Sequence, residues 1–125
     1  VAIRQFRFAA DEVVLEVPGG NIKEGQSVED TARAELLEET GYKAGEIITL
    51  GTGMWFDPAS WRVSAEFVLA TNCQKVSEQN LDATESIEIV VMPLEQWLDE
   101  IRKGEVSDMK SIAITLMAMQ YLGKI

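Results

Sequence analysis

The sequence predicts an α/β domain of the α/β/α sandwich type, with helices on both faces of a mixed β-sheet. Three observations support this prediction. Short alternating or β-branched segments recur along the chain, a strong helical segment interrupts them early, and two helical patterns follow the last of them. The 125 residues are sufficient for one domain with a single core, which we place at residues 1–125.

The expected strands are separated by turns, loops and one helix. Residues 1–8 alternate and indicate a strand, Asp11 marks a turn, and residues 13–17 form a second strand that leads into a Pro-Gly-Gly turn. Between the later strands lie an aromatic loop at 54–61 and a polar loop at 72–84. Those later strands are expected at 45–53, 61–70 and 87–92.

Two helices are expected in the last third of the chain. Pro93 suits the first turn of a helix that ends near Gly104, and Asp108 is the expected N-cap of the final helix. The final helix carries a broad apolar face, whose methionines we interpret as core residues. Its members are Ile112, Leu116, Met119, Tyr121 and Leu122.

The first helix is predicted over residues 28–40, a stretch without Pro or Gly. Ser27 is the expected N-cap, with Asp30 in the capping-box position three residues on. Gly41 is the expected stop, since glycine readily adopts the left-handed conformation that ends a helix.

Three glutamates share one side of this helix. At about 100° per residue, Glu38 lies roughly 60° to one side of Glu35 and Glu39 roughly 40° to the other. Apolar residues fall in the same arc, so this side is expected to face protein, where crowded anions need a compensating cation. No Lys or Arg stands three or four residues from Glu35 on the helix. The pattern therefore favours Mg²⁺ or Mn²⁺ as the cation, and the alternative is a solvated acidic helix face.

Composition excludes several classes of function. The net charge of −10 argues against binding to nucleic acid or to an anionic membrane surface. The chain has no histidine, which excludes His-based triads and His-ligated zinc. Cys73 is the single cysteine, so no internal disulfide is possible, and a cytoplasmic location is expected. No apolar run is long enough to span a membrane.

The helix and the turn before it resemble the Nudix box, G-x5-E-x7-R-E-U-x-E-E-x-G-U, where U is a bulky apolar residue. Gly20 and the segment 35–42 match seven of the nine specified positions at the right spacing. Two positions depart, because the first family Glu is Gln26 here and the family Arg is Ala34. The resemblance implies the Nudix fold and hydrolysis of a nucleoside diphosphate linked to another group.

The two departures differ in weight. Gln26 retains the ability to form hydrogen bonds at the junction of loop and helix. Ala34 stands one turn before Glu38, where an Arg would pair with that carboxylate and orient it. Arg33 is not a simple replacement, since it points about 160° away from Glu35 around the helix. Either another cation supplies the missing charge, or activity is weak or lost.

Other segments resemble the branch of the family that acts on ADP-ribose and related nucleotide sugars. Gln5-Phe6-Arg7 and Glu16-Val17-Pro18-Gly19-Gly20 match its Q-Y-R and E-L-P-x-G segments, and Pro58 falls where this branch has a proline. Residues 82–88 match its D-x-x-E-x-x-E loop, which makes Glu85 the candidate for a further catalytic glutamate. This branch normally has additional N-terminal strands. Their absence suggests a truncated or fragmentary chain, or an incomplete N-terminus.

The resemblance assigns a role to each candidate residue. Glu35, Glu38 and Glu39, with the carbonyl of Gly19, are the implied metal ligands and catalytic carboxylates. Glu85 is the implied base that takes a proton from the attacking water. Arg7 and Pro58 are implied to contact the substrate, and Glu16 is implied to contact the substrate or the metal network. Independently of the resemblance, the rings of Trp55 and Phe56 could stack on a nucleobase of the substrate. The products would be a nucleoside monophosphate and a sugar phosphate, and a homodimer is expected.

Competing interpretations remain for the whole protein and for single residues. A Nudix-fold nucleotide-binding module without turnover is favoured by Ala34 and opposed by the retained carboxylates. A housecleaning pyrophosphatase for nucleoside triphosphates is the third possibility. Arg7 is alternatively a surface charge and Glu85 a solvated loop acid. Trp55 and Phe56 alternatively cap the core, although their π-faces suit a nucleobase.

Overall fold

The computed structural model describes all residues of the chain, 1–125. Its helices are α1 (Val28–Thr40), α2 (Leu94–Lys103) and α3 (Met109–Tyr121). Its strands are β1 (Ala2–Arg7), β2 (Glu12–Glu16), β3 (Tyr42–Lys43), β4 (Glu46–Trp55), β5 (Ser64–Thr71), β6 (Gln74–Lys75) and β7 (Ile87–Val90).

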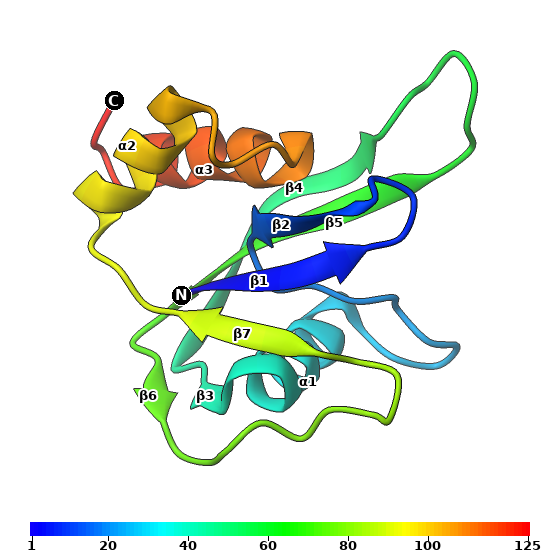
Figure 1. Cartoon of the computed structure of the whole chain (residues 1–125), viewed down its shortest axis with the longest axis vertical. Coiled ribbons are helices and arrows are strands. Elements are labelled where there is room, and N and C mark those ends of the chain that lie inside the picture. Colours follow the sequence, from blue (N-terminus) through cyan, green and yellow to red (C-terminus); the bar gives the residue numbers. More distant parts are fainter.

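The strands form three sets of hydrogen-bonded ladders, and every registered pair is antiparallel. β1 lies between β2 and β7, with Ile3 opposite Glu16 on one side and Gln5 opposite Ile87 on the other. β4 pairs with β5 in a long hairpin, and β3 pairs with β6. Figure 1 shows α1 on one side of these strands and α2 with α3 on the other. This arrangement confirms the α/β class with helices on both faces.

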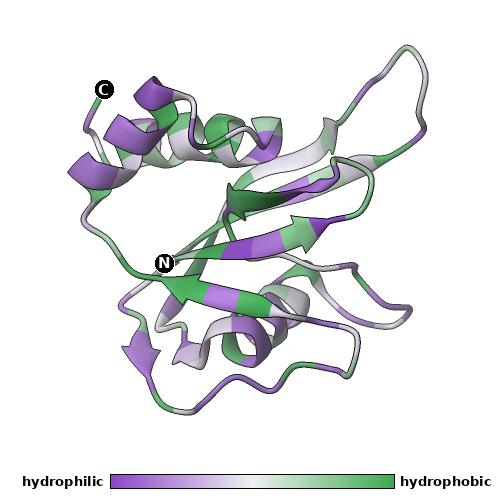
Figure 2. Cartoon of the chain, viewed as in Figure 1, coloured by the Kyte–Doolittle hydropathy of each residue, from purple (hydrophilic) through white to green (hydrophobic).

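The core lies between the β1–β2 hairpin and the two C-terminal helices. Ala2, Leu15, Trp97 and Val106 pack together there, and each is at least nine-tenths buried. The indole Nε1 of Trp97 donates a hydrogen bond to Thr115 Oγ1 at 2.8 Å, which joins α2 to α3. Figure 2 shows a polar residue between apolar ones in β7, whereas β1 begins with the apolar, buried Ala2 and Ile3 and becomes more exposed toward Arg7.

Local chemistry sets the ends of α1 as the sequence predicts. The side chain of Ser27 accepts a hydrogen bond from the backbone N–H of Asp30 at 3.0 Å. Gly41 has a φ of 72° and donates its N–H to Leu37 O at 2.8 Å. A side chain at position 41 would also collide with the backbone of Ser77, because a Cβ there would lie 1.9 Å from its carbonyl oxygen. Both predicted ends of the helix are confirmed.

Two expectations about packing are wrong. The apolar face of α3 is largely exposed, with Ile112 at 39% and Leu116 at 57%, so it does not contribute to the core. The segment 72–84 is more than a polar loop, because it contains β6 and hydrogen-bonds to the end of α1. No helix combines the length and the apolar character needed to cross a membrane.

Candidate active site

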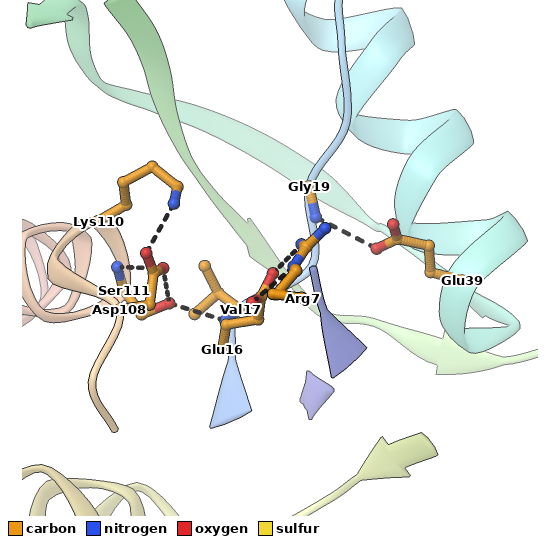
Figure 3. A network of polar contacts seen from close by, with 8 residues as sticks. All are labelled: Arg7, Glu16, Val17, Gly19, Glu39, Asp108, Lys110 and Ser111. Carbon is orange, nitrogen blue, oxygen red and sulfur yellow. Dashed lines mark hydrogen bonds and ion pairs between the residues drawn. The ribbon is translucent and has the colours of Figure 1, made fainter. Parts of the chain in front are cut away.

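The glycine turn after β2 lies against the carboxylates of α1. The backbone N–H of Gly19 donates a hydrogen bond to Glu39 Oε2 at 3.2 Å, as Figure 3 shows. A Cβ on Gly20 would lie 2.2 Å from the carboxyl carbon of Glu35. Only a glycine at position 20 therefore leaves room for the Glu35 carboxylate in its present place.

Glu39 is the buried member of the carboxylate cluster. Its exposed fraction is only 4%, and burial, with smaller contributions from the charges of Glu35 and Glu85, raises its pKa to about 7. The Gly19 N–H and the Arg7 guanidinium oppose that rise in pKa. A cation beside this carboxyl group would favour its charged form.

Glu35 is half-buried and faces the same surroundings. Burial raises its pKa, the charges of Glu38 and Glu85 add to the effect, and Lys23 works against it. Glu38 itself is exposed. The structure therefore places Glu35, Glu39 and Glu85 near enough for their charges to influence one another, and it leaves the Glu38 side chain facing solvent.

Arg7 is held by Glu16 rather than lying as a free surface charge. Its Nε donates to Glu16 Oε2 at 3.0 Å and its Nη2 donates to the other carboxylate oxygen. Glu16 is 6% exposed, whereas 45% of the Arg7 side chain is open to solvent. The hydrogen bond to Glu16 raises the pKa of Arg7, and the charges of Glu16, Glu39 and Asp108 add to this. One end of the guanidinium is thus anchored beside the carboxylate cluster.

The N-terminus of α3 fastens the chain just before the glycine turn. Asp108 Oδ2 accepts hydrogen bonds from the Ser111 backbone N–H at 3.0 Å and the Ser111 hydroxyl at 2.7 Å. The same Ser111 oxygen accepts the backbone N–H of Val17 at 2.9 Å (Figure 3). Burial opposes ionisation of Asp108, but hydrogen bonds from Lys110 and Ser111 outweigh it and lower its pKa. The sequence predicts the Asp108 cap, but nothing in it points to the contact between Ser111 and Val17.

The predicted aromatic residues lie apart from the carboxylates. Trp55 is 56% exposed and Phe56 is 37% exposed, so neither caps the core. The β4–β5 loop extends beyond the rest of the domain in Figure 1. A depression of about 290 Å³ on this hairpin is lined by Trp55, Pro58, Ala59, Ser60, Trp61 and Arg62. Lys110 lies 5.4 Å from the centre of the Phe56 ring, which connects this loop to the N-terminus of α3.

Of the two departures from the box, the one at Gln26 is accommodated locally and the one at Ala34 is not compensated by an ion pair. Gln26 Oε1 accepts a hydrogen bond from Thr31 Oγ1 at 3.4 Å, which confirms its predicted place at the start of α1. Arg33 binds Glu29 and the carbonyl of Ala44, at 3.0 Å and 2.8 Å, so it does not replace the missing arginine. None of the ion pairs in the structure involves a box glutamate.

The donor set of this site suits a hard divalent cation. In the structure no three acidic side chains lie close enough together to hold a single ion. Their chemistry nevertheless fits one, because Glu35 and Glu39 offer carboxylate oxygens beside a glycine turn, and burial, with a smaller contribution from neighbouring carboxylates, raises the pKa of both. A cation among them would offset the repulsion between their charges.

Comparison with known proteins identifies the family. A family model described as NUDIX domain matches residues 1–112. The ADP-ribose pyrophosphatase of Bacillus subtilis (strain 168) is 32% identical over 123 residues, covering 98% of this chain and 64% of that protein. The GDP-mannose pyrophosphatase of Enterobacter sp. (strain 638) is 31% identical over 130 residues, covering 98% of this chain and 65% of that protein. The chain thus spans slightly less than two thirds of these relatives.

A solved structure described as an ADP compounds hydrolase has the same fold. It superposes with a TM-score of 0.85 at 22% identity, covering 98% of this chain and 65% of that one. Together with the match over residues 1–112 and with the glycine turn that packs against Glu35 and Glu39, this similarity leads to one conclusion. The chain belongs to the Nudix hydrolase family.

Proposed function

We propose that this chain carries the catalytic site of a divalent-metal-dependent hydrolase that cleaves the pyrophosphate of ADP-ribose or a related nucleotide sugar. The products would be a nucleoside monophosphate and a sugar phosphate. The observation that carries the proposal is the buried Glu39 carboxylate, which is hydrogen-bonded to Gly19 and shares its surroundings with Glu35 and Glu85. The names of the relatives supply the substrate class.

Glu35 and Glu39, with the carbonyl of Gly19, are the groups that would hold Mg²⁺ or Mn²⁺, with Glu38 available as an exposed further ligand. When bound, such an ion neutralises pyrophosphate charge and makes water a stronger nucleophile at neutral pH. The glycines at 19 and 20 keep this part of the site free of side chains, so that phosphate oxygens can approach the backbone.

The remaining residues bind and orient. Arg7 uses two of its donors on Glu16 and keeps the others for a phosphate or ribose oxygen, which suits a half-exposed guanidinium. Glu85 is the nearby carboxylate outside the box, and we assign it the role of accepting the proton of the attacking water. Trp55 and Pro58 line a depression that offers a ring face to a nucleobase.

A nucleotide-binding module without turnover is the second candidate. Ala34 removes the arginine that would orient Glu38, and Glu38 lies exposed without an ion pair. Against this candidate stands the cluster itself, since a protein that only binds has little reason to retain mutually repelling carboxylates. The homodimer implied by the resemblance stays a prediction, which light scattering on the purified chain would test.

Product analysis separates the two candidates. We expect ADP-ribose with Mg²⁺ to give AMP and ribose phosphate, and Glu39→Gln to abolish the reaction. Glu95→Gln, an exposed acid on α2, serves as the matched control and should keep full activity. If no nucleotide sugar in a panel is hydrolysed with either metal, but one binds, the protein is a binding module.

A further inference from the structure

The segment between β6 and β7 covers the C-terminal end of α1, where the carboxylates stand. Four successive carbonyl oxygens at the end of a helix lack partners within the helix. Here the carbonyls of residues 38–41 all receive hydrogen bonds from residues 75–80. The donors are Lys75 Nζ to Thr40 at 2.6 Å, Val76 N and Ser77 N to Gly41 at 2.9 and 3.2 Å, Gln79 Nε2 to Glu39 at 2.8 Å, and Asn80 N to Glu38 at 2.8 Å.

Gln79 makes the contact that joins three parts of the site. Its amide nitrogen carries two donor hydrogens, and it lies 2.8 Å from the Glu39 carbonyl on α1 and 2.8 Å from the Ile87 carbonyl on β7. The two ends of the segment 79–87 are therefore linked through a single side chain. Figure 1 shows this segment passing along α1 before it enters β7.

Glu85 lies within the segment that Gln79 closes. Inside that segment, Glu85 Oε1 accepts the backbone N–H of Asp82 at 3.2 Å and Thr84 Oγ1 donates to Asp82 at 3.0 Å. These short-range contacts shape the loop but do not attach it to α1. The loop is attached to α1 by the hydrogen bond from the Asn80 N–H to the Glu38 carbonyl and by the bond from Gln79 to the Glu39 carbonyl. The second bond of Gln79 attaches it to β7.

We infer that Gln79 is a positioning residue, which sets the distance between the Glu39-bearing turn of α1 and the loop that carries Glu85. It acts through the backbone carbonyls of Glu39 and Ile87 and has no contact with substrate. With Ala34 in place of an arginine, no ion pair holds the box glutamates. The attachment through Gln79 therefore orients the turn of α1 that carries Glu39. The inference rests on the proposed function, in which Glu39 and Glu85 act together.

Two substitutions at this position separate the donors from the bulk of the side chain. Gln79→Met keeps the length but removes both donors, and Gln79→Lys supplies an ammonium with three donors on a chain of similar reach. For Gln79→Met we expect kcat to fall by on the order of tenfold to a hundredfold, because a small displacement of reacting groups has effects of this size. KM should change little, and Gln79→Lys should recover much of the loss. Gln96→Met, on the exposed side of α2, is the matched control.

Hydrogen exchange provides a measurement that does not depend on turnover. In Gln79→Met, amides of the last turn of α1 and of residues 80–87 should exchange faster, and in Gln79→Lys they should return toward the wild-type rate. Circular dichroism establishes that each variant is folded before the comparison. Faster exchange together with an unchanged kcat would overturn the positioning role, and so would an exchange rate equal to that of the wild type.

The outcomes also distinguish this inference from the proposed function. If the wild-type protein hydrolyses no nucleotide sugar, the proposed function fails, and the exchange comparison alone then decides the attachment made by Gln79. If the wild type is active and Gln79→Met raises KM while kcat stays unchanged, Gln79 acts on substrate binding and the inference is wrong.

Discussion

The backbone N–H of Gly19 donates a hydrogen bond to the buried carboxylate of Glu39 across 3.2 Å. This contact joins two segments that are separated by twenty residues in the sequence. It brings a backbone free of side chains to the most buried acid of the box, which leaves room there for the proposed metal and pyrophosphate.

The stability of the metal-free protein should fall as the pH rises. Glu39 has a folded-state pKa of about 7, which is above the pKa of a glutamate in an unfolded chain. At pH values between these two pKa values, the folded state therefore binds more protons than the unfolded state. This contribution is complete at acidic pH and is lost as the pH rises through about 7, at a cost on the order of 2 to 3 kcal/mol. Urea denaturation in EDTA at pH 5 and pH 8 measures the difference, which Glu39→Gln should reduce. Added Mg²⁺ should restore stability at pH 8, and a pH-independent difference between wild type and Glu39→Gln would contradict the assignment.

Replacing Gly20 by alanine should displace the Glu35 carboxylate. A Cβ at this position would lie 2.2 Å from the Glu35 carboxyl carbon, so the side chain must rotate away. We expect the affinity for Mn²⁺ to fall by about tenfold or more, in line with the loss of an oriented metal ligand. Titration of Mn²⁺ by electron paramagnetic resonance measures this affinity without reference to substrate. Unchanged Mn²⁺ binding in a folded Gly20→Ala protein would mean that Glu35 is not a ligand.

Restoring the box arginine should increase turnover. Position 34 lies one helical turn before Glu38, whose carboxylate is exposed and has no ion pair, so Ala34→Arg can pair with it. We expect kcat with ADP-ribose to rise severalfold. Ala34→Met adds comparable bulk without charge and should have no such effect. Equal rates in the wild type and Ala34→Arg would indicate that another group already performs this role.

Removing the Ser111 hydroxyl should destabilise the fold. Ser111 has no exposed surface, and its oxygen both accepts the Val17 N–H and donates to Asp108. Ser111→Ala leaves the Val17 N–H without a partner, which costs about 1 to 3 kcal/mol. Urea denaturation at neutral pH measures the loss, and Ser111→Thr should retain more stability than Ser111→Ala. Equal stability of the wild type and Ser111→Ala would show that water replaces the contact.

Local rules predict α1 well because its ends depend on neighbouring residues. Ser27 and Gly41 end the helix through hydrogen bonds made within four residues, and both are visible in the sequence. The direction of Arg33, away from the box glutamates, follows in the same way from the helical repeat. These features need no knowledge of the rest of the fold.

Contacts between distant segments escaped prediction. Residues 72–84 have the polar composition of a loop, yet Gln79 bonds to α1 and β7, and no local pattern distinguishes it from a solvated glutamine. The apolar face of α3 predicts burial, yet Leu116 is exposed, because the residues that pack on α3 determine which part of it is covered. The Lys110 contact with the Phe56 ring likewise joins segments that are far apart in sequence.

The sequence by itself determined the fold class, the ends of α1, and the presence of three carboxylates beside a glycine turn. Periodicity and capping follow from covalent geometry and short-range hydrogen bonds, so they can be read in order along the chain. Only the tertiary structure decided that Glu39 is buried, that Glu38 is exposed, and that the charge of Glu85 acts on Glu35 and Glu39. Burial and charge coupling depend on the distance between folded segments, and no local pattern in the sequence gives that distance.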